Sequence, residues 1–488
     1  MRTSGAGRLA ALGAAFVLTA ASPAASADRI PITTSSDEAR KLYLEGRDLN
    51  EKLRATDARA RFQKAAAKDP EFALAQVGLA NTSGTAKEFF EGVDRAVALA
   101  GKASEAEKLL ICALDAGAKG EPARQSECLS KLIAAHPDDE RAHNLMGAYH
   151  FGRQDYSAAV EEYKKATAIN PQFSQPYNQM GYAYRFMGKN AEAEQSFKKY
   201  IELIPGDPNP YDSYAELLMK LGRFDESIKM YEKALSVDPN FVASYIGIGN
   251  DRVFLGQPQE ARAAYARLAR VARNDGEKLQ AHFWTAQSYV HEGATDKAVA
   301  ELKKMIAIDE ANKDFAAMSG TYNQMGNILL EAGRVDDAAA RFKDQLAAIE
   351  KADVAVQVKD ATRRQHLFDQ GRVALARKDI PAAKAKTAAY ATAVDAKKIP
   401  FEVRQSHELA GRVALAENNY AVAVGELRQA NQQDPRVVYL LATALEGKGH
   451  TREAKDAAVQ AADWNALSNT YGFVRGKARA MATAPKKN

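Results

Sequence analysis

The pentapeptide YNQMG occurs twice in the chain, at Tyr177–Gly181 and at Tyr322–Gly326. A fixed sequence period explains the distance of 145 residues between the two copies. Residues 140–173, 174–207 and 208–241 form three abutting blocks of 34 residues. Four such blocks and nine inserted residues separate the two pentapeptides, so both copies occupy the same place in a block. The chain is therefore a tandem repeat.

The blocks share residue types at fixed places, counted from the first residue of each block. In the three blocks above, places 8, 20, 24 and 32 hold Gly147, Gly181 and Ala215; Ala159, Ala193 and Ser227; Tyr163, Phe197 and Tyr231; and Pro171, Pro205 and Pro239. Small residues at places 8 and 20 allow two helices to pack closely, and we expect these two places to face each other. Asp or Asn before Pro, as in KDPEF, INPQF and VDPNF, predicts where the second helix ends.

This pattern resembles the tetratricopeptide repeat, a helix–turn–helix unit. The register predicts units at 39–72, 73–105, 106–139, 140–173, 174–207, 208–241, 242–275, 279–312, 319–352, 364–397, 404–437 and 438–468. The resemblance implies an all-α, right-handed solenoid of about twelve helix pairs, shaped as an elongated curved rod, with longer helices from about Ala311. No segment is left over for a catalytic domain.

The N-terminus has the pattern of an export signal. Arg2 and Arg8 precede an apolar stretch, and Ala25-Ser26-Ala27 fits a small-residue cleavage site. Residues 1–27 are therefore predicted to be a cleavable signal peptide without a lipid-anchoring cysteine, and residues 28–38 a lead-in. The expected location is periplasmic or extracellular. The whole chain also resembles a group of exported bacterial repeat proteins that open with IPITTSSDEARKLYLEGRDL (residues 30–49) and end with a YGFVR-like segment, but that group implies no activity.

The net charge of +5 arises mainly at the two ends of the chain. The last residues carry five cations and no acid: Arg475, Lys477, Arg479, Lys486 and Lys487. A nucleic-acid site would need a basic stripe along a folded face, and we expect none. Residues 469–488 are predicted to be either a frayed, solvated tail or a capping helix for the last repeat.

The sequence predicts no enzyme, metal site or cofactor. HELAG at His407 lacks the second histidine of a zinc-binding helix, because the fifth residue is Gly411. His143 and His282 both fall at place 4 and are expected to pack in the core. Cys112 and Cys128 lie at places 7 and 23 of one unit, where either a disulfide or two buried free thiols would fit.

In repeats of this type the first helix of each unit lines a concave face through places 2, 5, 9 and 12. Transferring that pattern predicts a protein-binding groove formed by Asn144, Asn178, Tyr182, Arg185, Asp212, Glu216, Asn250, Gln287, Asn323 and Asn327. Amide side chains both donate and accept hydrogen bonds, which suits the peptide groups of an extended chain. The alternative is that these are ordinary polar surface positions.

The expected function is that of a non-enzymatic scaffold that binds an extended segment of another protein along the concave face. One alternative is a structural subunit of a cell-envelope complex that packs through its convex face or its ends. A small-molecule-binding or catalytic role is a further alternative, but it would need a closed pocket with convergent titratable groups, and the sequence shows none. The partner and the oligomeric state are open.

Overall fold

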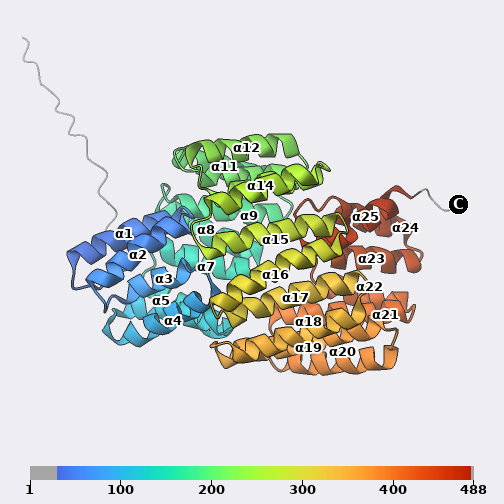
Figure 1. Ribbon diagram of the computed structural model, residues 1–488. Coiled ribbons are helices and arrows are strands. Elements are labelled where there is room, and N and C mark those ends of the chain that lie inside the picture. Colours follow the sequence, from blue (N-terminus) through green and yellow to red (C-terminus); the bar gives the residue numbers. More distant parts are fainter. Residues whose placement is uncertain (1–29, 485–488) are drawn as a thin grey trace, which may run out of the picture.

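A computed structural model describes residues 30–484, and the predicted signal peptide lies outside them. Within these residues the chain forms 25 α-helices and one short 3-10 helix, with no strand. The predicted all-α solenoid fold is therefore confirmed. Twelve antiparallel helix pairs follow one another, and a single helix, α25, closes the chain (Figure 1).

The odd-numbered helices contact one another from pair to pair, as α1 contacts α3 and α7 contacts α9, so they form the inner face of the solenoid. The inner helices are α1 (Asp37–Glu51), α3 (Ala73–Asn81), α5 (Glu105–Ala118), α7 (Glu140–Gly152), α9 (Ser174–Phe186), α11 (Asn209–Lys220), α13 (Val242–Phe254), α15 (Asp275–His291), α17 (Phe315–Glu331), α19 (Val356–Ala376), α21 (Pro400–Ala416) and α23 (Pro435–Gly447). The outer helices are α2 (Ala55–Lys68), α4 (Ala86–Leu99), α6 (Pro122–Ala135), α8 (Tyr156–Ile169), α10 (Asn190–Leu203), α12 (Phe224–Val237), α14 (Pro258–Val271), α16 (Thr295–Ala311), α18 (Val335–Lys351), α20 (Ile380–Asp395), α22 (Tyr420–Gln429) and α24 (Thr451–Ala462).

The Asp-Pro and Asn-Pro corners end the outer helices. Asp69, Asn170 and Asp238 adopt extended backbone angles directly after α2, α8 and α12. The prolines that follow them favour this conformation in the preceding residue. The corners therefore set where each pair stops and the next one begins.

The small residue at place 8 has a different role from the one we expected. A Cβ atom on Gly147 or Gly249 would lie 2.4 Å or 2.1 Å from the ring of Tyr163 or Tyr265 at place 24 of the same unit. The glycine is thus required by the aromatic ring, and not by the small residue at place 20. Places 8 and 20 do face each other as expected, because the hydroxyl of Ser227 (place 20) donates to the carbonyl oxygen of Ala215 (place 8), at 2.8 Å.

The inner helices are longer from α15 to α21. This lengthening begins at Asp275, earlier than the expected start near Ala311, whereas α23 again has 13 residues. α15, α17 and α21 have 17 residues and α19 has 21, whereas α13 has 13. The residues that separate the predicted units here, such as 315–318 and 400–403, form the first turns of α17 and α21.

The solenoid turns back on itself instead of extending as an open rod. Arg54, after α1, forms an ion pair with Asp238, at 3.3 Å, and Thr56 donates to Glu277, at 2.9 Å. Arg273 pairs with Asp57, at 3.1 Å, and the backbone N–H of Lys87 donates to Asp314, at 3.4 Å. These contacts join residues about 180 to 230 positions apart, so the first pairs touch the middle of the chain.

Residues 469–483 form α25 (Asn469–Thr483), so a frayed tail is wrong for this segment. The helix contacts α24 and α23 and also reaches back to α15 and α17. Tyr471 is fully buried, and Arg475 donates to the carbonyl oxygen of Phe254, at 3.2 Å. α25 therefore lies across the carboxyl ends of inner helices from the middle of the chain. No helix within residues 30–484 has the length and hydropathy of a bilayer-crossing segment.

Candidate functional site

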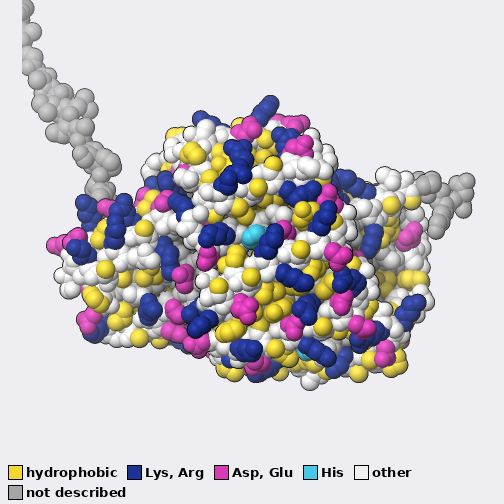
Figure 2. All heavy atoms as spheres, in the orientation of Figure 1, with side chains coloured by type: hydrophobic (Ala, Val, Ile, Leu, Met, Phe, Trp, Pro, Cys, Tyr) yellow, Lys and Arg dark blue, Asp and Glu magenta, His cyan; other side chains and the backbone are white. Residues whose placement is uncertain are grey.

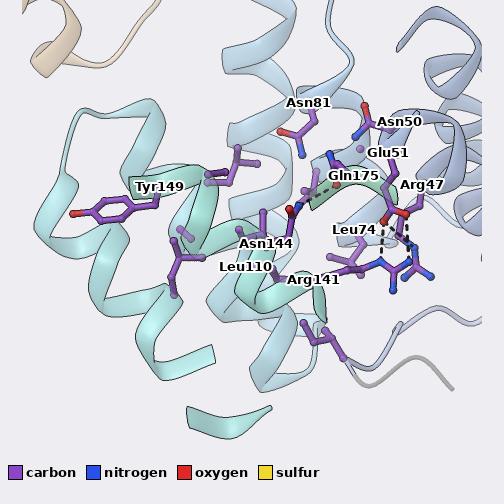
Figure 3. Close-up of a pocket in the computed structure, with 18 of the residues that line it drawn as sticks. Arg47, Asn50, Glu51, Leu74, Asn81, Leu110, Arg141, Asn144, Tyr149 and Gln175 are labelled. Carbon is purple, nitrogen blue, oxygen red and sulfur yellow. Dashed lines mark hydrogen bonds and ion pairs between the residues drawn. The ribbon is translucent and has the colours of Figure 1, made fainter. Parts of the chain in front are cut away.

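A cavity of about 600 Å³ opens on the inner face of the first five pairs. It is lined by α1, α3, α5, α7 and α9, by part of α6, and by the extended residues before α1 (Figure 3). We call this cavity the N-terminal groove. Eleven of the 27 lining residues fall at places 2, 5 and 9 of their units, as Arg141, Asn144 and Ala148 do in the fourth unit.

The floor of the N-terminal groove is aliphatic. Leu145 of α7 is 38% exposed, which is unusual for a leucine in the middle of a helix that faces inward. Val77, Leu110 and Leu114 are half-buried beside it. Partly exposed aliphatic side chains in a concave site lose contact with water when a ligand covers them, and this favours binding.

Amide side chains line the same groove. The Nδ2 atom of Asn144 donates to Oε1 of Gln175, at 3.0 Å, whereas its Oδ1 atom is buried and has no partner among the described residues. Asn50 and Asn81 bring two further amides to the side where Gln175 lies, and Tyr149 lies at the opposite end in this view (Figure 3). Amide groups that line a groove can donate to and accept from the peptide groups of a ligand.

The charged groups of the groove neutralise one another. Arg141 forms an ion pair with Glu51, at 2.7 Å, and another with Glu140, at 3.0 Å. Burial disfavours the charged form of Arg141, but Glu51, Glu140 and Asp139 outweigh burial and raise its pKa. Arg47 lies 4.0 Å from Glu51. The groove therefore offers aliphatic and amide contacts to a ligand, with little net charge.

Two elements support the wall of the groove. Cys112 of α5 and Cys128 of α6 are joined in a disulfide, with their Cα atoms 6.1 Å apart. They belong to a cluster with Ala113, Leu129 and Tyr149, which line the groove. On the other side, Ile30 and Ile32 are both buried and line the groove.

Of the ten residues predicted to form the binding groove, Asn144 lines the N-terminal groove. The other nine lie on inner helices from α9 to α17, where four of them are buried and five are half-buried. Asn178 is 1% exposed and Gln287 is fully buried. The inner face of these later pairs is therefore largely covered.

Most of the nine residues make bonds to a neighbouring helix. Arg185 pairs with Glu216, at 3.2 Å, and the Tyr182 hydroxyl donates to Ser213, at 3.3 Å. The other bonds run from Ser244 to Asp212 (2.7 Å), from Tyr265 to Asn250 (2.8 Å), from Asn323 to Gln345 (3.0 Å) and Asp369 (3.2 Å), and from Arg372 to Asn327. These side chains hold neighbouring pairs together, which leaves them less available to a ligand.

Buried carboxyl groups accompany these bonds. Burial, together with the nearby Glu216, raises the pKa of Asp212 to about 8. Burial likewise raises the pKa of Asp251 to about 8 and that of Asp309, which lies near Asp314, to about 7. They lie apart from the N-terminal groove, so we treat them as part of the packing.

The histidines at place 4 bond the inner helix of a pair to its outer helix. His143, His282 and His407 each share a hydrogen bond with a glutamate of the outer helix: Glu162, Glu301 and Glu426, at 2.7, 2.8 and 2.8 Å. His143 is buried, as expected for a core position, whereas His282 is half-buried. Within residues 30–484, His, Cys, Asp and Glu side chains do not gather in groups of three or more that could hold a metal ion.

The sequence pattern missed most of the groove. The predicted groove residues begin in the fourth unit, where polar side chains recur. They therefore do not include the lining residues Arg47, Asn50, Asn81 and Leu110. Applying places 5, 9 and 12 to the first unit would have found Tyr43, Arg47 and Asn50.

Comparison with known protein families agrees with this geometry. A tetratricopeptide-repeat model matches residues 246–313, and a second one matches residues 174–207 and 209–241. A further model, described as TPR repeat, matches residues 150–188. The chain is a tetratricopeptide-repeat protein. Such repeats generally serve as scaffolds for protein–protein interaction, and their stacked inner helices form extended concave surfaces.

Several solved structures are similar to this tetratricopeptide-repeat chain. The crystal structure of the MamA protein has 19% identity and a TM-score of 0.29, covering 34% of this chain and 91% of its own. The Cut9–Hcn1 hetero-tetramer of the APC/C has 14% identity and a TM-score of 0.42, covering 87% and 76%. YrrB, a TPR protein with an unusual peptide-binding site, has 18% identity and a TM-score of 0.26, covering 38% and 94%. No curated protein sequence matches the chain.

Proposed function

We propose that this tetratricopeptide-repeat protein binds an extended segment of a partner protein in the N-terminal groove and catalyses no reaction there. The observation that carries the proposal is the aliphatic floor of the groove, where Leu145 and Ala148 are exposed and the amide of Asn81 is exposed in the same lining. The side chains of a peptide cover the leucine, and its backbone N–H and C=O groups can bond to the amides of the groove.

The charge balance supports a polypeptide partner over a nucleic acid. The lining holds three arginines and two carboxylates, and Arg141 is paired with Glu51 and Glu140, so the groove has no stripe of unpaired cations such as a nucleic acid would need. Figure 2 shows Lys and Arg interspersed with Asp and Glu over the visible face, without a stripe of one sign.

Peptides selected from a random library of displayed peptides can test this proposal. We expect fluorescence anisotropy with a selected peptide to show at least about a tenfold loss of affinity for Leu145→Asp. Leu255→Asp is the matched control, because Leu255 is 37% exposed but lies outside the groove lining. An equal effect of the two substitutions, or no selectable peptide, would contradict the proposal.

Asn144→Ala tests the amide contact separately. It removes the acceptor and leaves the aliphatic floor in place, so we expect a smaller loss of affinity than for Leu145→Asp. Circular dichroism of each variant checks that the helices are retained.

We further propose that the protein is exported and acts in the periplasm or outside the cell. The pattern of residues 1–27 supports this. Mass spectrometry of the protein from its native host should then find a mature chain that begins at Asp28. An intact N-terminal Met1 in the native protein would contradict export by signal cleavage.

A further inference from the structure

Residues 30–36, IPITTSS, precede α1 as an extended segment that lies along the rim of the N-terminal groove. Ile30 and Ile32 are buried, whereas Pro31 and Thr33 between and after them are exposed. Ile30 packs with Ala106 and Ala142, at the starts of α5 and α7, and Ile32 packs with Ala39 and Leu74, at the starts of α1 and α3. The segment thus crosses the amino ends of four inner helices, with its aliphatic side chains alternating as in a strand.

Three carboxylates, from the first and third predicted units, accept hydrogen bonds from the backbone of this segment. The N–H of Ile30 donates to Oδ2 of Asp139, at 3.2 Å, and the N–H of Thr33 donates to Oε1 of Glu107, at 2.7 Å. The N–H of Ser35 donates to Oδ2 of Asp69, at 2.9 Å. Hydrogen bonds from N–H groups to ionised carboxylates are stronger than those between neutral groups.

Each of these carboxylates uses its other oxygen for its own helix or corner. Oδ1 of Asp139 accepts from Arg141 and Ala142 at the start of α7, and Oε2 of Glu107 accepts from Ser104 in the capping box of α5. Oδ1 of Asp69 accepts from Glu71. The receiving groups would therefore stay in position if the segment left, so the rim is a preformed site for an extended chain.

We infer that this rim is a second recognition element of the groove, specific for an extended segment with aliphatic side chains at alternating positions, and that residues 30–36 are its resident occupant. The partner segment has the same character and competes with residues 30–36. This inference rests on the proposed function for its biological role, but the occupancy of the rim can be tested alone. Ile30 and Ile32 also line the groove, so a partner that displaces them changes the shape of the pocket that holds it.

The test uses the full chain carrying Ile30→Asp and Ile32→Asp, which brings carboxylates toward Asp139 and Glu107 and so releases the segment. The probe is a fluorescent nonapeptide with the sequence of residues 28–36, DRIPITTSS. We expect one-to-one binding that is at least about tenfold tighter to this variant than to the wild-type chain, whose rim is occupied. A peptide with both isoleucines replaced by serine should bind this variant with at least about tenfold lower affinity. Equal binding to the variant and the wild type, or no binding to a folded variant, would overturn the inference.

Substitutions in the rim show where the nonapeptide binds. In the chain that carries Ile30→Asp and Ile32→Asp, the further change Glu107→Gln should weaken binding of the nonapeptide. Asp155→Asn should not weaken it, because Asp155 caps α8 and no hydrogen bond joins it to the segment. Equal losses from the two changes would count against the rim.

A measurement on the wild-type chain covers the case in which the released variant misfolds. Hydrogen exchange at the amides of Thr33 and Ser35 should be at least about tenfold faster than in the middle of α1, because an occupant can leave without unfolding its site. Exchange as slow as in α1 would overturn the inference. If the nonapeptide fails while library peptides still depend on Leu145, this inference fails and the proposed function stands.

Discussion

The inner face of the solenoid differs between the first five pairs and the later ones. In the N-terminal groove, Leu145 and Ala148 of α7, at places 6 and 9 of their unit, are exposed. At the same places of later units, Ser213, Asn250 and Gln287 are buried. The helix-pair repeat continues through both regions, although several later inner helices are longer, so the repeat alone does not determine where a ligand can bind.

The two regions differ in whether the inner side chains of successive units form hydrogen bonds and ion pairs with one another. In the later pairs, acids, amides and arginines meet partners one unit away, as Arg185 meets Glu216 and Arg364 meets Glu402. In the first four units, place 9 carries Arg47, Asn81, Leu114 and Ala148, and the bond from Asn144 to Gln175 joins α7 to α9. α25 adds a second cover by packing across the ends of α13, α15 and α17.

Breaking a buried ion pair of the covered region should have the largest effect. Nε and Nη2 of Arg364 each donate to Glu402, at 2.8 Å, and both side chains are about nine-tenths buried. Arg364→Leu leaves Glu402 buried without its cation, and we expect a loss of about 3–5 kcal/mol in the free energy of unfolding around α19 and α21. Urea titration followed by hydrogen exchange in these helices measures it.

The double variant Arg364→Leu, Glu402→Leu is the control for that prediction. It removes both charges, so it should recover most of the lost stability. A single variant that costs less than about 1 kcal/mol would show that the pair is not desolvated, and that the covered region is more open than described.

The buried acids predict a pH dependence that belongs to the covered region. The folded-state pKa values of Asp212 and Asp251, at about 8, are above the value near 3.9 of an unfolded aspartate. The unfolded state therefore loses these protons first, and stability falls as the pH rises from about 4 to about 8. Asp251→Asn should remove part of this fall and raise the melting temperature at pH 8.5 while leaving it nearly unchanged at pH 4.

Thermal scans at the two pH values measure this effect. Asp155→Asn is the control, because Asp155 is exposed at the start of α8. Equal shifts at pH 4 and pH 8.5 for Asp251→Asn would contradict a neutral buried acid.

Gln287 offers a smaller test. Its side chain is fully buried, and neither its oxygen nor its nitrogen has a partner among the described residues. Gln287→Leu should therefore stabilise α15 by about 1 kcal/mol. Gln345→Leu, which breaks the bond between Gln345 and Asn323, should instead destabilise. Denaturant titration compares the two, and a loss of stability in Gln287→Leu would show that the amide is engaged.

The smallest effect on stability is expected in the open region. Ala148 is exposed in the groove, so Ala148→Phe should change the free energy of unfolding by no more than about 0.5 kcal/mol while obstructing peptide binding. Ala286 is fully buried, and Ala286→Phe should cost about 1–3 kcal/mol through overpacking. Equal costs for the two substitutions would remove the distinction between the regions.

The sequence was sufficient for the fold because helix pairs depend on local spacing. The Asp-Pro corners and the glycines opposite aromatic rings act within one unit or between neighbours, as Gly147 and Tyr163 do. The sequence could not show which part of the inner face is open. That depends on contacts such as Arg54 with Asp238 and Arg475 with Phe254, whose partners lie 184 and 221 residues apart and follow no period.

Photo-crosslinking of a library-selected peptide tests most directly whether ligands bind in the N-terminal groove. The peptide would carry a benzophenone group, and mass spectrometry would locate the adducts on the full chain. We predict adducts on α3, α5 and α7, around Asn81, Leu110 and Leu145, that disappear in Leu145→Asp. Adducts on inner helices from α13 onward, or on outer helices around Val97, would contradict the account.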